Sequence, residues 1–258
     1  MKQRRNVGGL ELEFEAPEAG RYMAPIIVCP GLFQSFDCWR PLTSMLAHRG
    51  WEIYFAARGP DDASPNDTGF GWQANLDRVA TAAGALGEKV VLFGSDLGAA
   101  MALAVVERTG TLALALFSPS RPDRLLDALN ASSGLMESRN RGPWRQAPRR
   151  IAKLAANPSH VTVESALLLE EASRAGFEVP GQHPPALVFV GNDDSLVPGP
   201  ESALFAAGAY SKQARARLSG RWWPAGGPAS IADEVHRYLI LTLGDRVVEF
   251  PKEILADD

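Results

Sequence analysis

The sequence has little cysteine: Cys29 and Cys38 are its only two thiols. So few cysteines argue against a disulfide framework and against a structural zinc site. Cys29 ends an apolar run, and we expect it to be a small core residue, since free cysteine is among the residue types most often buried. We therefore expect no metal ion, and no other cofactor is indicated.

The chain also lacks an excess of basic residues and any long apolar stretch. Its net charge of −4 gives no electrostatic argument for nucleic acid as a partner. No run approaches the roughly 18 apolar residues that a membrane span requires. The opening MKQRRNVGGLELEFE has a basic pair without an apolar region behind it, unlike a signal peptide. We expect a cytoplasmic protein with no membrane association, and 258 residues with 46% hydrophobic content allow one large domain with a full core.

Strand-like and helical segments alternate along most of the chain, which is typical of an α/β protein with a mostly parallel sheet and helices on both faces. The alternation of apolar and acidic residues over Leu10–Phe14 predicts an antiparallel hairpin strand at an edge. Further strands are predicted at Pro25–Cys29, Trp51–Ala57, Val90–Phe93, Leu112–Phe117 and Ala186–Val190. Helices are predicted at Trp39–Arg49, Trp72–Leu86, Ala99–Val106, Pro200–Gln213 and Ala229–Leu243.

Residues 121–180 interrupt this alternation. They are rich in proline and arginine and contain three helix-like pieces near Arg124–Leu129, Ala147–Ala155 and Val163–Ala175. We therefore divide the chain into a core, 1–120 and 181–258, and a helical insertion, 121–180. The tail after Asp245 would add a short edge strand or contact a second copy of the chain, which would make a homo-oligomer.

One segment, VVLFGSDLGAA at residues 90–100, carries the most specific signal. An apolar run breaks at Gly94 and resumes as a small-residue helix after Gly98, which predicts a strand, a sharp turn and a helix. Glycines at these two places suit a strained turn with no room for a Cβ, and such a turn exposes the residue midway between them, Asp96. Ser95 is one place too early, because centring the frame on it would require glycine at Phe93 and Leu97.

This pattern resembles the nucleophile elbow of the α/β-hydrolase superfamily, in which the central residue is usually serine. With Asp96 there, the chain is similar to the branch that holds epoxide hydrolases and haloalkane dehalogenases. The resemblance implies the α/β-hydrolase fold, with residues 121–180 as a small helical cap over the pocket. The segment PIIVCPGLFQSFDCW is similar to the strand and oxyanion loop of that family. The resemblance implies that backbone N–H groups of Leu32 or Phe33, with that of Leu97, line an oxyanion hole, and that these side chains form an apolar pocket wall.

Two further segments are similar to the loops that carry the acid and the histidine of the catalytic triad. ALVFVGNDDSLVP places Asp194 at the acid position, and GRWWP places Trp222 at the histidine position. No histidine lies between His183 and His236, and His236 comes about four helical turns too late. The resemblance therefore implies a degenerate triad of Asp96 and Asp194 with no histidine. We predict that Trp222 packs beside Asp96 in the volume of the missing imidazole.

The missing base limits the chemistry. An aspartate nucleophile would form an ester with an epoxide or haloalkane, and water activated by histidine would then have to hydrolyse that ester. Leu97 stands where haloalkane dehalogenases place a halide-binding tryptophan, and residues 121–180 have no tyrosine to assist the opening of an epoxide ring. A carboxylate that attacks an ester gives only an anhydride.

Two classes of function remain open. In the first, the protein has lost ordinary hydrolytic turnover and binds a small apolar molecule in a capped pocket, or serves as a scaffold. In the second, it is an enzyme: a lyase, isomerase or cyclase that uses Asp96 as acid or base, or an epoxide, haloalkane or ester hydrolase with a base from elsewhere, such as His160. Burial and a facing Asp194 would both favour a protonated Asp96, which suits either class.

Overall fold

The structure is a computed structural model of the 258-residue chain. It describes residues 3–18, 22–31, 34, 36–56, 71–87, 89–127, 168–177, 180, 183–191, 214–219 and 227–244.

A single eight-stranded sheet runs through the described part of the chain, in the strand order β1-β2-β4-β3-β5-β6-β7-β8. Its strands are β1 (Gln3–Val7), β2 (Leu10–Glu15), β3 (Ile26–Cys29), β4 (Ile53–Phe55), β5 (Val90–Ser95), β6 (Thr111–Phe117), β7 (Ala186–Gly191) and β8 (Ala214–Ser219). Strands β3 to β8 are parallel to one another, and the β1–β2 hairpin joins antiparallel through β4. The mostly parallel sheet is thus confirmed.

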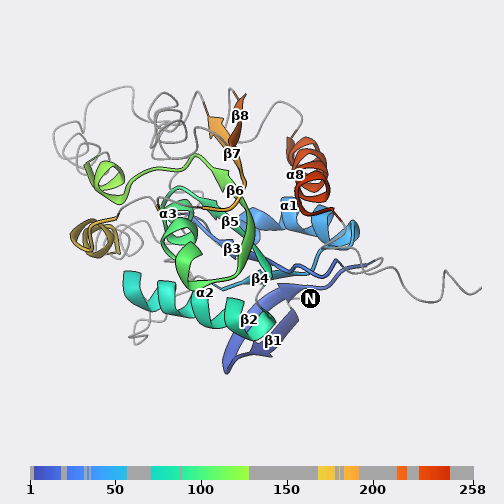
Figure 1. Ribbon diagram of the computed structural model, residues 1–258, viewed down its shortest axis with the longest axis horizontal. Coiled ribbons are helices and arrows are strands. Elements are labelled where there is room, and N and C mark those ends of the chain that lie inside the picture. Colours follow the sequence, from blue (N-terminus) through green and yellow to red (C-terminus); the bar gives the residue numbers. More distant parts are fainter. Residues whose placement is uncertain are drawn as a thin grey trace, which may run out of the picture.

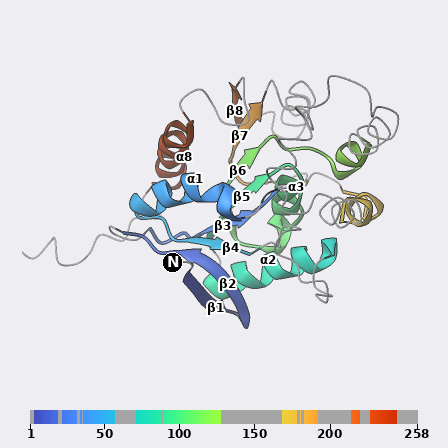
Figure 2. The ribbon, with the colours of Figure 1, turned by 180° about the vertical axis from the view of Figure 1, so that it is seen from behind.

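Helices cover both faces of this sheet. They are α1 (Phe36–His48), α2 (Trp72–Leu86), α3 (Leu97–Ala104) and α8 (Gly227–Leu243), with a 3₁₀ turn, η2, at Val106–Arg108. Figure 1 shows α1 and α8 on one side of the sheet and α2 and α3 on the other. The view from behind gives the same two layers (Figure 2).

The N-terminal hairpin turns at two glycines. Val7 pairs with Leu10, which leaves a two-residue loop of Gly8 and Gly9, both at positive φ (58° and 82°). Two consecutive residues with positive φ define a hairpin turn that matches the twist of the strands, and glycine adopts it without a Cβ clash. β1 therefore forms the edge of the sheet, and the predicted strand, β2, lies one place inward.

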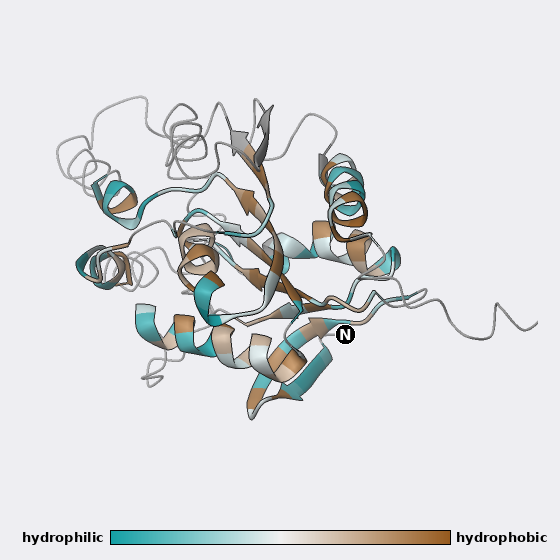
Figure 3. Ribbon diagram, in the orientation of Figure 1, coloured by the Kyte–Doolittle hydropathy of each residue, from teal (hydrophilic) through white to brown (hydrophobic). Residues whose placement is uncertain are grey.

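The core has two parts, one on each face of the sheet. Along β5, Val90 and Leu92 belong to the cluster under α2 and α3, whereas Val91 and Phe93 belong to the cluster under α1 and α8. All four are fully buried. Such a strand reads as a continuous apolar run because both of its faces are covered, and Figure 3 shows the strands at the centre of the molecule as predominantly hydrophobic.

Most predicted elements are confirmed, with shifts at their ends. Helix α2 has the predicted bounds, whereas α1 begins three residues before the predicted start at Trp39. The added turn buries Phe36 against Phe55, with ring centroids 4.6 Å apart. The predicted helix at Ala99–Val106 begins earlier, directly after Asp96, and ends in η2. Strand β8 is not among the predicted strands.

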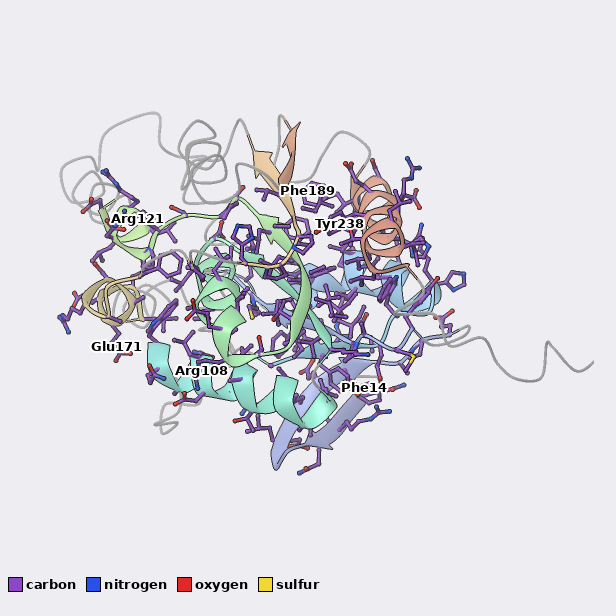
Figure 4. The ribbon with its side chains drawn as sticks, viewed as in Figure 1. Phe14, Arg108, Arg121, Glu171, Phe189 and Tyr238 are labelled. Carbon is purple, nitrogen blue, oxygen red and sulfur yellow. The ribbon has the colours of Figure 1, made fainter. Side chains whose placement is uncertain are left out.

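The insertion predicted at 121–180 is described only at its two ends. Within residues 168–177, three side chains are buried in the core cluster that contains α2 and α3: Leu168, Leu169 and Ala172. Glu171 Oε2 accepts the backbone N–H of Trp72, the first residue of α2, at 2.8 Å. In Figure 4, Glu171 is labelled beside the end at which α2 begins. This end of the insertion is therefore joined to the core; the division into core and cap stays a prediction.

The predicted helix at 200–213 and the tail after Asp245 lie outside the described residues. In the part of the chain that is described, no helix is both long and apolar enough to cross a membrane.

Candidate functional site

The turn between β5 and α3 places Asp96 in a strained backbone conformation. Asp96 has φ 49° and ψ −115°, a region that L-residues rarely adopt. Its N–H donates to the carbonyl of Phe117 on β6 at 3.0 Å, and its own carbonyl accepts the N–H of Ala99 at 3.1 Å. Because such conformations cost about 1–3 kcal/mol and persist only where the surroundings impose them, they gather at functional sites.

The two flanking glycines are required by close backbone contacts. A Cβ on Gly94 would lie 2.4 Å from the carbonyl oxygen of Gly98, and a Cβ on Gly98 would lie 2.0 Å from that of Cys29. Neither space can hold a methyl group. The predicted strand, sharp turn and helix are therefore present, with Asp96 between the strand and the helix.

Ser95 belongs to the strand, as its place in the glycine frame indicates. It is the last residue of β5 and only 3% exposed. Its Oγ accepts a hydrogen bond from Gln34 Nε2 at 3.0 Å. The residue at the strained turn is the neighbouring aspartate.

The Asp96 carboxylate lies against the backbone of Gly31. A Cβ on Gly31 would lie 2.4 Å from Asp96 Oδ2, so only glycine allows the carboxylate to occupy this place. Asp96 is 4% exposed. The following residue, Leu97, is the first residue of α3; it is 1% exposed and belongs to the core cluster that contains α2 and α3.

Four other predicted site residues lie outside the described residues: Leu32, Phe33, Asp194 and Trp222. Their predicted places beside Asp96, as pocket wall, triad acid and substitute for the histidine, stay predictions.

Three of the four histidines are described, and all three lie at the end of the sheet opposite to Asp96. His183 directly precedes β7, and its Nδ1 lies 2.8 Å from the carbonyl oxygen of Pro184. Nδ1 of His236, on α8, accepts a hydrogen bond at 3.0 Å from Nε1 of Trp51, a residue that lies just before β4. His48 ends α1 and pairs with Glu18 at the exposed surface. Since β4, β5 and β7 are parallel, their amino ends lie together at one end of the strands, and the Asp96 turn lies at the carboxyl ends. His160 lies outside the described residues.

Cys29 lies on the strand next to the Asp96 turn. It is paired with Gly94 in the sheet, fully buried, and its pKa is raised to about 12 by burial. A thiol that stays protonated is neither a nucleophile nor a metal ligand at neutral pH. The expected core role of Cys29 is confirmed. Among the described residues, no group of three His, Cys, Asp or Glu side chains is arranged to hold a metal ion.

Two polar residues beside Asp96 are absent from the sequence-based site. Gln34 is 3% exposed and binds Gly31, Trp39 and Ser95. Ser118 follows β6 and is 6% exposed, with φ 44° and its N–H bonded to the carbonyl of Phe189 at 2.7 Å. Because Ser95 is paired with Phe117, Ser118 directly follows β6 at the place where Asp96 directly follows β5. The polar segment SPSRP, which directly follows the predicted strand at Leu112–Phe117, is the sequence feature that could have indicated Ser118.

Comparison with solved structures shows the same fold. The chain resembles an esterase from Thermogutta terrifontis (18% identity, covering 94% of this chain and 99% of the esterase, TM-score 0.64). It also resembles a hormone-sensitive lipase from a metagenome library (16%, 94% and 86%, 0.64) and a serine hydrolase involved in carbazole degradation (18%, 93% and 99%, 0.62). At these identities the likeness concerns the fold alone. None of the curated proteins matches the chain.

The sequence itself gives the family. A model of the alpha/beta hydrolase family matches residues 26–256, which include every described helix and all strands after the N-terminal hairpin. The predicted fold class is confirmed, and the chain belongs to the alpha/beta hydrolase family.

Proposed function

We propose that this family member binds a small apolar molecule above Asp96 and lacks ordinary hydrolytic turnover. The observation that carries the proposal is the buried carboxylate at the strained turn, where the family's usual residue is a serine hydroxyl. In this proposal the turn is the nucleophile elbow, and Asp96 is the residue that the elbow presents.

The chemistry of a carboxylate supports the loss of turnover. Attack by Asp96 on an epoxide or haloalkane would leave an ester of Asp96, and release of that ester needs a water molecule and a base. The three described histidines lie at the far end of the sheet, and we propose that Trp222 occupies the place of the triad histidine beside Asp194. Loss of one triad member typically costs about 10⁴-fold in rate.

The surroundings of Asp96 support an apolar ligand. Leu97, the residue after Asp96, is buried in the core, and we propose that Leu32, Phe33 and Trp222 form an apolar wall around the carboxylate, covered by the cap at 121–180. Apolar pockets with one polar group are common ligand sites even without chemistry. The bond from Glu171 to the first turn of α2 supports a cap that is fixed to the core at this end.

The turnover experiment uses p-nitrophenyl esters, styrene oxide and short haloalkanes with the purified protein and with Asp96→Ala. We expect no turnover above that of Asp96→Ala. Hydrolysis of any of these compounds at an ordinary enzymatic rate, abolished in Asp96→Ala, would overturn the proposal.

The binding experiment is a thermal-shift screen of small hydrophobic acids, amides and ketones. A ligand at a hundredfold excess over its dissociation constant stabilises the fold by roughly 2.7 kcal/mol. We expect hits that Phe33→Ala weakens, whereas Leu241→Ala, which changes a side chain that is 68% exposed on α8, leaves them unchanged. A panel without any shift at saturation would remove ligand binding and leave a scaffold role.

A second candidate is an enzyme in which Asp96 serves as general acid or base in a lyase, isomerase or cyclase step. The buried hydrogen-bond network of Gln34 and Ser95 favours it, because catalytic acids and bases are held in place by such networks. Incubation of ketone hits in deuterated water tests it. Deuterium uptake beside the carbonyl that is lost in Asp96→Asn would support this candidate over the first.

A further inference from the structure

The side chain of Gln34 joins three separate segments around the Asp96 turn. Its Oε1 accepts hydrogen bonds from the N–H of Gly31 and from Trp39 Nε1, both at 2.9 Å. Its Nε2 donates to Ser95 Oγ at 3.0 Å. The amide thereby links the loop after β3, the first turn of α1 and the last residue of β5, and it is 3% exposed.

Gln34 and Asp96 flank the same glycine. The position of a Cβ on Gly31 lies 2.4 Å from Asp96 Oδ2 and 3.1 Å from Gln34 Cδ. The Gly31 carbonyl accepts the N–H of Gln34 at 3.2 Å, which closes the loop into a turn. On the other side, Gln34 holds Ser95, the residue that directly precedes Asp96 in the chain.

We propose that Gln34 is the positioning residue of this site. Its amide fixes Gly31, against which the Asp96 carboxylate lies, and Ser95, the residue that directly precedes Asp96. The inference rests on the proposed function in one respect, namely that Asp96 is the residue that meets the ligand. It adds that the N–H of Gly31 is bound within the protein and is not offered to a ligand oxygen.

A primary amide suits this place because the three partners need both an acceptor and a donor. Two N–H groups converge on Oε1, whereas the serine oxygen receives Nε2–H. Leucine has nearly the same shape but would leave both N–H groups buried without acceptors. Glutamate could keep the geometry, since the Ser95 hydroxyl can rotate to donate, but it would bring a second carboxyl group beside Asp96.

The test follows the Asp96 carboxyl carbon by NMR in protein labelled at aspartate, with the signal assigned by Asp96→Asn. Among the described residues, the segments at this turn carry the buried thiol of Cys29 on β3 and two surface ion pairs, Asp37 with Arg40 on α1 and Asp123 with Arg121 after β6. We expect Gln34→Glu to move the titration midpoint of Asp96 upward by about one pH unit, because like charges disfavour ionisation. The control is Thr43→Val, which removes a buried hydroxyl from α1 that bonds the carbonyl of Trp39 at 3.1 Å.

A second readout is the reaction of Asp96 with an aryl epoxide, followed by intact mass. The carboxylate oxygen forms a bond to a ring carbon, the carbon–oxygen bond of the epoxide breaks, and the ring oxygen takes a proton from water. The product is a hydroxyalkyl ester whose mass increase equals the mass of the reagent. We expect ester formation to fall about tenfold or more in Gln34→Leu, because small misplacements of reacting groups have large kinetic costs. In Gln34→Glu it should recover at higher pH.

The outcomes separate this inference from the proposed function. An Asp96 midpoint that Gln34→Glu leaves unchanged, or that Thr43→Val moves equally, would overturn the role of Gln34. Melting temperatures confirm that each variant is folded. Hydrolytic turnover by the unmodified protein would instead overturn the proposed function and leave the midpoint measurement valid.

Discussion

Replacement of Gly98 by alanine tests the geometry of the Asp96 turn. A Cβ at this place would lie 2.0 Å from the carbonyl oxygen of Cys29 and 2.4 Å from that of Pro30. Both are backbone atoms, so α3 and the end of β3 would have to part by about 1 Å or more to restore ordinary contact. Overpacking in cores costs about 1–3 kcal/mol and occasionally more. We expect the upper end here, about 3 kcal/mol, because no flexible side chain can yield.

Urea unfolding measures this cost. With an m-value of about 3 kcal/mol per molar, a loss of about 3 kcal/mol lowers the midpoint by about 1 M. The matched control is Gly84→Ala on α2, where an added Cβ meets nothing within 4 Å. Alanine is favoured over glycine by about 0.5–1 kcal/mol inside a helix, so this variant should be more stable than the unmodified protein. A Gly98→Ala midpoint equal to that of the unmodified protein would refute the close approach of α3 to β3, and with it the turn described here.

Two further predictions concern contacts at the ends of helices. Glu171→Ala removes the acceptor for the first N–H of α2 and should lower the free energy of unfolding by about 0.5–2 kcal/mol, measured in urea. Glu170→Ala, which removes an exposed ion pair, should cost about 0.5 kcal/mol or less, and equal losses would contradict the capping role. The pKa of His236 is lowered by burial and by the charge of Arg49. The native state therefore binds fewer protons than the unfolded chain, so this contribution to stability is present above pH 6.5 and is lost as the pH falls through the lower native pKa. The urea midpoint of unfolding should decrease as the pH is lowered from 7 to 5, and it should decrease less in His236→Phe. Trp51 fluorescence reports the loss of the hydrogen bond to His236.

Several features could be predicted from the sequence because neighbouring residues decide them. The strand, turn and helix around Asp96 follow from Gly94 and Gly98, whose spacing allows a turn that no other residue type fits. Helix α2 has a regular apolar face between Gly71 and Gly87, and both of its bounds are as predicted. The parallel sheet follows from the alternation of strands and helices, since helical crossovers join parallel strands.

Other features depend on contacts between distant segments. Strand β8 reads ARARLS, which alternates apolar and polar residues but contains no β-branched or aromatic residue and so has low strand propensity; it forms because β7 supplies a parallel partner. Gln34 was not predicted to belong to the site, because its partner Ser95 is 61 residues away in sequence and is brought near only when β3 and β5 pair.

The sequence by itself determined the fold class and the residue at the strained turn. Only the tertiary structure decided what surrounds that residue: the Gly31 backbone against the carboxylate, the amide of Gln34 bonded to Gly31, and Ser118 directly after the next strand. The physical reason is the range of the forces involved. Backbone sterics act between adjacent residues, so a short motif is enough to predict their effect. The hydrogen-bond partners of a buried group depend instead on which strands pair and in which register.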